Sequence, residues 1–155
     1  MRHASTLATL VAVAMVGPAI IGTARSLETA VHERKEVAGL AVVFGAEPEP
    51  ALTDEMQFLR WRITSLSDSA AYTGLQDATV TVTRAGQQYG PFTLRPVRRE
   101  PGLYQTQHIF TASGEYQSVL KFRKGDDPTV HSVDFNFRIG DRATLEIPRR
   151  RPAEP

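Results

Sequence analysis

The chain has 155 residues, with 18 Lys and Arg residues against 17 Asp and Glu residues, and no cysteine. A chain of this length allows one domain, and the absence of cysteine excludes a disulfide framework, a thiolate nucleophile, and zinc–thiolate or iron–sulfur sites. A net charge of +1 gives little support to nucleic-acid binding, which needs a clear basic excess on one face.

Residues 1–26 have the organisation of a secretory signal peptide. Arg2 gives a basic start, residues 7–21 are almost uninterruptedly apolar, and residues 24–26 place small side chains where signal peptidase reads them. The apolar stretch of about 15 residues is shorter than the roughly 20 that a membrane span needs. We therefore predict cleavage and export, to the periplasm or another extracytoplasmic location. An uncleaved N-terminal anchor is the alternative.

Cleavage would remove Arg2 and Arg25 and no acidic residue. The balance of 18 basic against 17 acidic residues would become 16 against 17, a net charge of −1. The slight basicity of the sequence therefore belongs to the signal peptide. Residues 27–36 are charged and lack clear periodicity, so they are predicted to be a leader that joins the signal to the domain.

From residue 37 onward, short apolar runs alternate with turn residues, and no helical period is long enough for a substantial helix. This pattern predicts an all-β domain over residues 37–147, a seven-stranded immunoglobulin-like antiparallel β-sandwich. Residues 148–155, rich in arginine and proline, are predicted to be a disordered tail. The seven predicted strands cover residues 37–44, 56–65, 78–84, 91–97, 103–110, 115–123 and 129–139.

Residues 56–65 have the clearest strand pattern. Leu59, Trp61 and Ile63 fall on one face of the strand, and the two residues between them are arginines. Such alternation predicts one buried face and one solvated face. Trp61 is therefore predicted to lie in the core rather than to stack on a ligand.

Two Gly-x-Tyr units, one with Gly102 and Tyr104 and one with Gly114 and Tyr116, begin two of the late runs. In many immunoglobulin-like sandwiches a tyrosine at such a place pins a corner, with its ring in the core and its hydroxyl on nearby backbone. The units predict two adjacent strands that face each other across a turn. They indicate a scaffold rather than an active site.

Several segments resemble a known family. They are Leu40-Ala41-Val42-Val43-Phe44 before an acidic, proline-rich turn, Gly74-Leu75-Gln76-Asp77-Ala78, Phe92-Thr93-Leu94-Arg95-Pro96-Val97, and the two Gly-x-Tyr units. Together, over residues 37–139, they resemble exported bacterial immunoglobulin-like domains of the YtkA-like kind, which are related in architecture to CopC-like copper carriers. The resemblance implies the sandwich fold and an exported location, and it says less about activity.

The copper association of the CopC-like carriers fits this sequence poorly. Such a carrier would be expected to begin its mature chain with a histidine that binds copper through its own amino group. Here the predicted mature start is Leu27, and the nearest histidine is His32. Cleavage after Thr29 would make His32 the third residue, where it binds Cu(II) with the terminal amine, but that site does not fit signal-peptidase rules. Met56 is the only methionine beyond the signal, so no methionine-rich stretch offers soft ligands to Cu(I).

His108 and His131 lie inside the predicted domain, and strand parity points both of them inward. One interpretation is a two-histidine metal pair across the sandwich. We favour the other, in which each ring is half-buried near a strand end, because two imidazoles without a carboxylate or thiolate rarely hold a metal. No metal or cofactor is therefore predicted, and the weak candidates for copper are His32, His108 and His131.

No sequence feature points to an enzyme. Neither a Gly-x-Ser-x-Gly turn nor a phosphate-binding glycine loop is present. The predicted function is a non-enzymatic accessory or binding domain that contacts another cell-envelope protein. Loops over residues 67–74 and 87–90, with Tyr72 and Tyr89 exposed on them, are the predicted contact regions, because amphipathic aromatic residues make efficient contact area.

Two other functions stay open. One is a periplasmic copper-binding carrier, and the other is a membrane-anchored structural domain if residues 1–26 are retained. We predict no nucleic-acid partner, no small-molecule substrate, and no membrane span once the signal is cleaved.

Overall fold

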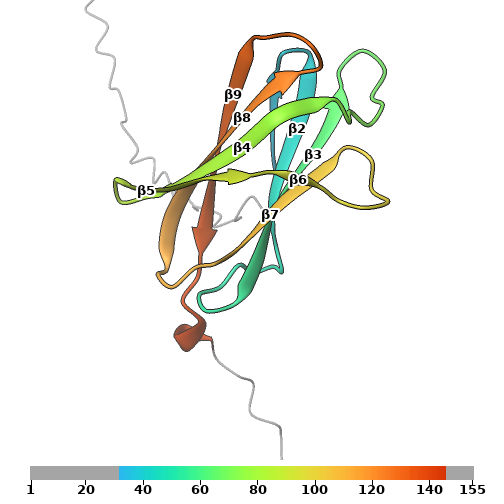
Figure 1. Ribbon diagram of the computed structural model, residues 1–155. Coiled ribbons are helices and arrows are strands. Elements are labelled where there is room, and N and C mark those ends of the chain that lie inside the picture. Colours follow the sequence, from blue (N-terminus) through green and yellow to red (C-terminus); the bar gives the residue numbers. More distant parts are fainter. Residues whose placement is uncertain (1–31, 146–155) are drawn as a thin grey trace, which may run out of the picture.

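The computed structural model describes residues 32–145, and these form a β-sandwich of two antiparallel sheets (Figure 1). The predicted signal peptide over residues 1–26 and the predicted tail over residues 148–155 lie outside the described residues. Within the described part, no helix is long and apolar enough to cross a membrane. The prediction of an all-β fold is confirmed.

Within residues 32–145, nine strands make up the two sheets. The five-stranded sheet has the order β1 (His32–Val37), β2 (Leu40–Glu47), β3 (Met56–Ser65), β7 (Leu103–Ile109) and β6 (Arg95–Pro96). The four-stranded sheet has the order β5 (Gln87–Thr93), β4 (Leu75–Arg84), β8 (Gly114–Lys124) and β9 (Val130–Ile139). A short 3-10 helix, η1 (Arg142–Thr144), follows β9.

The prediction of seven strands is wrong, and one of the two additional strands is β1. Residues 32–36 were predicted to belong to a leader, but they pair with β2 through a hairpin whose turn is Ala38-Gly39. Both turn residues have positive φ, 51° and 73°, as the tight turns of two-residue hairpins require. Because β1 is a charged strand at the edge of its sheet, it lacks the apolar alternation that reveals an inner strand.

The other additional strand results from a change of sheet. Residues 91–97 were predicted to form one strand, but the chain leaves the four-stranded sheet after Thr93 and joins the five-stranded sheet at Arg95. A strand that switches sheets in this way closes a corner of a sandwich. The alternation of apolar and polar residues does not show to which sheet a residue belongs. Residues 91–97 therefore look like one strand in the sequence.

The predicted pairing of the two Gly-x-Tyr strands is also wrong. β7 pairs with β3 and β6, whereas β8 pairs with β4 and β9, so the chain crosses between the sheets from β7 to β8. The predicted role of the tyrosines is confirmed. Both rings are buried, the Tyr116 hydroxyl donates to the Ala112 carbonyl at 2.6 Å, and the Tyr104 hydroxyl donates to the Tyr72 carbonyl at 3.4 Å.

The core lies between the inward faces of the two sheets. Trp61 is 0% exposed, which confirms its predicted position in the core. The Phe44 ring contacts both the Trp61 ring, at a centroid distance of 5.2 Å, and the Phe135 ring, at 5.3 Å. Phe44 and Trp61 come from the five-stranded sheet and Phe135 from the four-stranded sheet, so these aromatic contacts join the layers.

One side of the sandwich is closed by polar side chains. There the edge strands β1 and β9 meet, and the Lys35 Nζ lies 3.4 Å from the Asp134 Oδ2 and 5.4 Å from the centre of the Phe135 ring. The Glu33 carboxylate accepts a hydrogen bond from the Asn136 backbone N–H at 3.3 Å. These bridges cover the gap between the two edges, which limits further strand pairing there.

We expect Tyr116→Phe to destabilise the fold, because the substitution removes the short hydroxyl bond to Ala112 while keeping the buried ring. The expected loss is about 1 kcal/mol in the free energy of unfolding, measured by urea denaturation. Tyr89→Phe is the matched control, since its hydroxyl makes no hydrogen bond among the described residues and its side chain is exposed. Equal losses in the two variants would contradict the role of the corner.

Candidate functional site

The side of the sandwich opposite β1 and β9 is organised by the switch from β5 to β6. β5 pairs with β4, and at the switch the Leu94 N–H donates to the Ala78 carbonyl at 2.9 Å. Two residues further on, Pro96 is in register with Tyr104 of β7. Leu94 itself is 5% exposed, so a buried side chain anchors the crossing.

The switch leaves two edge positions empty among the described residues. β5 pairs with β4 from Thr79 onward, and the Leu94 N–H already occupies the Ala78 carbonyl, so residues 75–77 of β4 have no neighbouring strand on that side. β6 pairs with β7 only at Tyr104 and Gln105, so residues 106–109 of β7 have none either. Each empty position coincides with a cavity. We call these cavities the β4 groove and the β7 groove.

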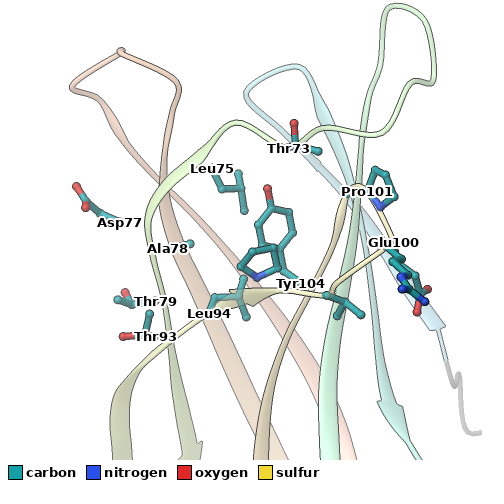
Figure 2. A pocket seen from close by; sticks show the side chains of 14 residues that line it. Thr73, Leu75, Asp77, Ala78, Thr79, Thr93, Leu94, Glu100, Pro101 and Tyr104 are labelled. Carbon is teal, nitrogen blue, oxygen red and sulfur yellow. The ribbon is translucent and has the colours of Figure 1, made fainter.

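The β4 groove has a volume of about 680 Å³ (Figure 2). Tyr104, Leu94 and Ala78 are buried and form an apolar floor, with Tyr104 beside Leu75 in the middle of the opening. Polar residues surround this floor. The groove is lined by Thr73, Leu75, Asp77, Ala78, Thr79, Thr93, Leu94, Pro96, Val97, Arg99, Glu100, Pro101, Gly102 and Tyr104.

One wall of the β4 groove is the first part of β4, which contains a bulge. The register between β4 and β8 shifts between Gln76 and Thr79, and Asp77 within the bulge has a φ of +50°. The Asp77 carboxylate accepts a hydrogen bond from the Arg123 Nε at 2.8 Å on β8. The bulge therefore directs the Asp77 carboxylate towards β8, where it pairs with Arg123.

The opposite wall is the turn between β6 and β7, which contains Arg99 and Gly102. Arg99 has a φ of +68°, a left-handed conformation that costs a residue with a Cβ about 1–2 kcal/mol. Gly102, with a φ of +75°, lies so close to β3 that an added Cβ would be 2.6 Å from the Ile63 carbonyl oxygen. The Ile63 N–H donates to the Gly102 carbonyl at 2.7 Å, which ties this wall to the core.

The ionisable group of the floor of the β4 groove is the Tyr104 phenol. Burial raises the pKa of the Tyr104 phenol, and a hydrogen bond from the Leu75 backbone opposes this with a smaller effect. The phenol is therefore neutral at ordinary pH. An apolar floor with polar walls and two exposed strand edges is suited to binding an extended chain.

The β7 groove is smaller, with a volume of about 210 Å³, and its lining contains no Asp, Glu, Lys or Arg. The His108 ring lies 4.4 Å from the Phe92 ring, and its Nε2 is 3.1 Å from the Thr106 Oγ1. Burial lowers the pKa of His108. At the rim, Ile109 is 58% exposed and Tyr89 is 41% exposed. The lining residues are Val82, Tyr89, Phe92, His108, Ile109, Phe110, Thr111, Ala112 and Tyr116, and none of them is a carboxylate.

The three histidine candidates for copper lie apart. His108 is in register with Gln57, near the end of the sandwich where β9 finishes, whereas His131 lies where β9 begins and packs on Phe122 at 5.7 Å. His32 is on β1, with its Nε2 3.9 Å from a Glu49 carboxylate oxygen. Within residues 32–145, no group of three or more His, Asp or Glu residues is placed to hold a metal ion.

The predicted contact loops are only partly loops. Tyr72, predicted to be exposed, is half-buried against the core, and its hydroxyl donates to the Gly74 carbonyl at 3.3 Å. Residues 87–90, predicted to be a loop, belong to β5, where Tyr89 is exposed as predicted. The short run Arg98-Arg99 was predicted to be a solvated end rather than a contact patch, whereas Arg99 lies on the wall of the β4 groove.

Comparison with solved structures finds a similar fold in a DUF4426 family protein from Pseudomonas aeruginosa PAO1. The TM-score is 0.55 at 13% sequence identity, and the alignment covers 72% of this chain and 96% of that chain. At this identity the likeness shows the β-rich fold alone. No protein-family model matches the chain, and no curated protein matches it. The resemblance to YtkA-like domains and CopC-like carriers therefore stays a prediction.

We expect Gly102→Ala to cost more stability than Gly86→Ala. Both glycines have positive φ, +75° and +80°, so both variants carry the backbone penalty of about 1–2 kcal/mol. Only Gly102 also meets the Ile63 carbonyl oxygen, whereas nothing lies within 4 Å of a Cβ at Gly86. Urea denaturation of both variants measures the difference, and equal costs would show that the close approach at Gly102 is unimportant.

The lowered pKa of His108 predicts a pH dependence of stability. The unfolded chain takes up this proton near the ordinary pKa of 6.5, at a higher pH than the folded protein does. Stability is therefore unaffected well above pH 6.5 and falls as the pH drops through 6.5 towards the folded-state pKa. His108→Phe should flatten this part of the stability profile, measured by denaturation at a series of pH values. An unchanged slope in the variant would assign the effect to other groups.

Proposed function

We propose that the protein is an exported, non-enzymatic accessory domain, an immunoglobulin-like sandwich that binds an extended segment of another cell-envelope protein in the β4 groove. The observation that carries the proposal is the empty edge position beside residues 75–77, which opens directly onto a cavity with a buried apolar floor. The exported location rests on the sequence of residues 1–26.

A segment bound in this position would continue the line of β5 along β4. Beside Thr79 and the residues after it, β5 already supplies the neighbouring strand, and its course leaves this line at Leu94. Strand addition of this kind draws affinity from main-chain hydrogen bonds and specificity from pockets for alternate side chains. The floor formed by Tyr104 and Leu94 supplies such a pocket.

The other long side of the sandwich is less suited to this role. The edges of β1 and β9 are joined by Lys35, Asp134 and Glu33, and β1 is charged along its length. Charged edges oppose the addition of a further strand. This asymmetry favours the β4 groove as the place of contact.

Site-specific photocrosslinking in the native envelope tests the proposal. A photoreactive residue at Thr93, an exposed position that lines the β4 groove, should give an adduct with a distinct envelope protein. Ser132 is the matched control, because it is an exposed strand residue at the opposite edge of the same sheet. If the photoreactive residue at Thr93 gives no adduct, or if Thr93 and Ser132 give the same adduct, the β4 groove is not the place of contact.

The state of the N-terminus is a separate question with a direct measurement. The intact mass of the exported protein distinguishes a cleaved domain from a membrane-anchored structural domain, the alternative that follows if residues 1–26 are retained. We expect the mass of the cleaved form.

A further inference from the structure

We propose that the segment bound in the β4 groove is acidic, and that Arg99 on its wall, in a segment that also carries Arg95 and Arg98, selects it. This inference rests on the proposed function and adds the chemistry of the partner. Arg99 lines the groove itself, and Arg95 and Arg98 belong to the same short segment. All three are exposed.

These arginines differ from the other arginines of residues 32–145 in their surroundings. None of the three takes part in an ion pair or a side-chain hydrogen bond with another described residue. Each of the others has a carboxylate within 4.0 Å, apart from Arg84, which donates to the Ser113 carbonyl at 2.8 Å. The arginines without an internal partner thus lie in one short segment, residues 95–99, beside the groove.

The carboxylates near the groove do not neutralise this wall. Asp77 is paired with Arg123 on β8, and Glu100 has its Oε2 3.4 Å from the Arg62 Nη2. Arg99 is therefore left as the lining residue whose charge has no ion-pair partner among the described residues, and it gives this wall a positive charge. A positive wall is complementary to an acidic segment and repels a basic one.

The backbone at Arg99 supports a role for its side chain. Its φ of +68° is a conformation that glycine adopts without strain, and the same turn has a glycine with positive φ at Gly102. An arginine at such a position keeps a guanidinium on the groove wall despite the strain.

The geometry indicates which parts of the β4 groove would bind the side chains of an acidic segment. An extended chain beside residues 75–77 directs alternate side chains to opposite sides. Apolar side chains would face the floor at Tyr104 and Leu94, and carboxylates would face the wall at Arg99. Arginine binds a carboxylate through two parallel N–H bonds, which gives direction as well as attraction.

A selection experiment tests this inference. The protein, purified in the form in which the cell exports it, is used to select binders from a displayed library of random linear peptides. We expect enrichment of peptides that alternate carboxylate and apolar residues. For a synthetic peptide of the enriched sequence, Arg99→Glu should weaken binding at least about tenfold, whereas Arg99→Lys should retain most of it. Arg34→Glu makes the same change of charge on the opposite edge strand and should leave binding unchanged.

A second variant separates this inference from the proposed function. Thr93→Trp covers the β4 groove from an exposed position, and its folding is verified by circular dichroism. Two results would overturn the acidic inference alone. In the first, the enriched peptides lose binding in Thr93→Trp but show no acidic bias. In the second, they lose binding in Thr93→Trp but bind Arg99→Glu as well as they bind the unsubstituted protein. If no peptide is enriched, or if the enriched peptides bind Thr93→Trp with unchanged affinity, both the acidic inference and the proposed function are overturned.

Anionic lipid is the competing explanation for a basic wall. Vesicles of equimolar phosphatidylcholine and phosphatidylglycerol provide the test, with the same Arg99→Glu and Arg34→Glu variants. Vesicle binding that is lost only in Arg99→Glu, without selection of acidic peptides, would assign the wall to a membrane surface and overturn the inference. Selection of acidic peptides without vesicle binding supports it.

Discussion

The hydrogen bond from the Leu94 N–H to the Ala78 carbonyl holds the point at which the chain changes sheets. Before it, the chain is the edge of the four-stranded sheet, and after it the chain is the edge of the five-stranded sheet. Because one segment serves both edges, neither sheet is covered along its full length. Both grooves follow from this single crossing, as does the position of the turn that carries Arg99.

The edge strands on the two long sides of the sandwich are covered in different ways. On one side, Lys35 bridges to Asp134 over the Phe135 ring and joins the sheets through side chains. On the other side, a strand crosses from sheet to sheet and leaves a cavity above the buried Tyr104. The closed side stabilises the domain, and the open side provides the recognition surface that we propose.

Alternation along the chain was a good guide to the inner strands and a poor guide to the edges. The strand predicted over residues 56–65 has the same bounds in the structure, and Trp61 is buried as expected, because both faces of an inner strand impose a pattern on the sequence. The edge strand at residues 32–37 has little burial to reveal it. The partners of β7 and β8, and the groove beside Arg99, depend on contacts between distant segments, which local patterns do not contain.

The basic wall of the β4 groove also bears on self-association. An empty edge position invites a second copy of the same chain, the route by which sheet proteins aggregate. Two copies that met through their β4 grooves would bring the wall that carries Arg99 in one copy close to the same wall in the other. Like charges opposed at close range disfavour that pairing. The residues that we propose to attract an acidic partner would therefore also keep the edge free for it.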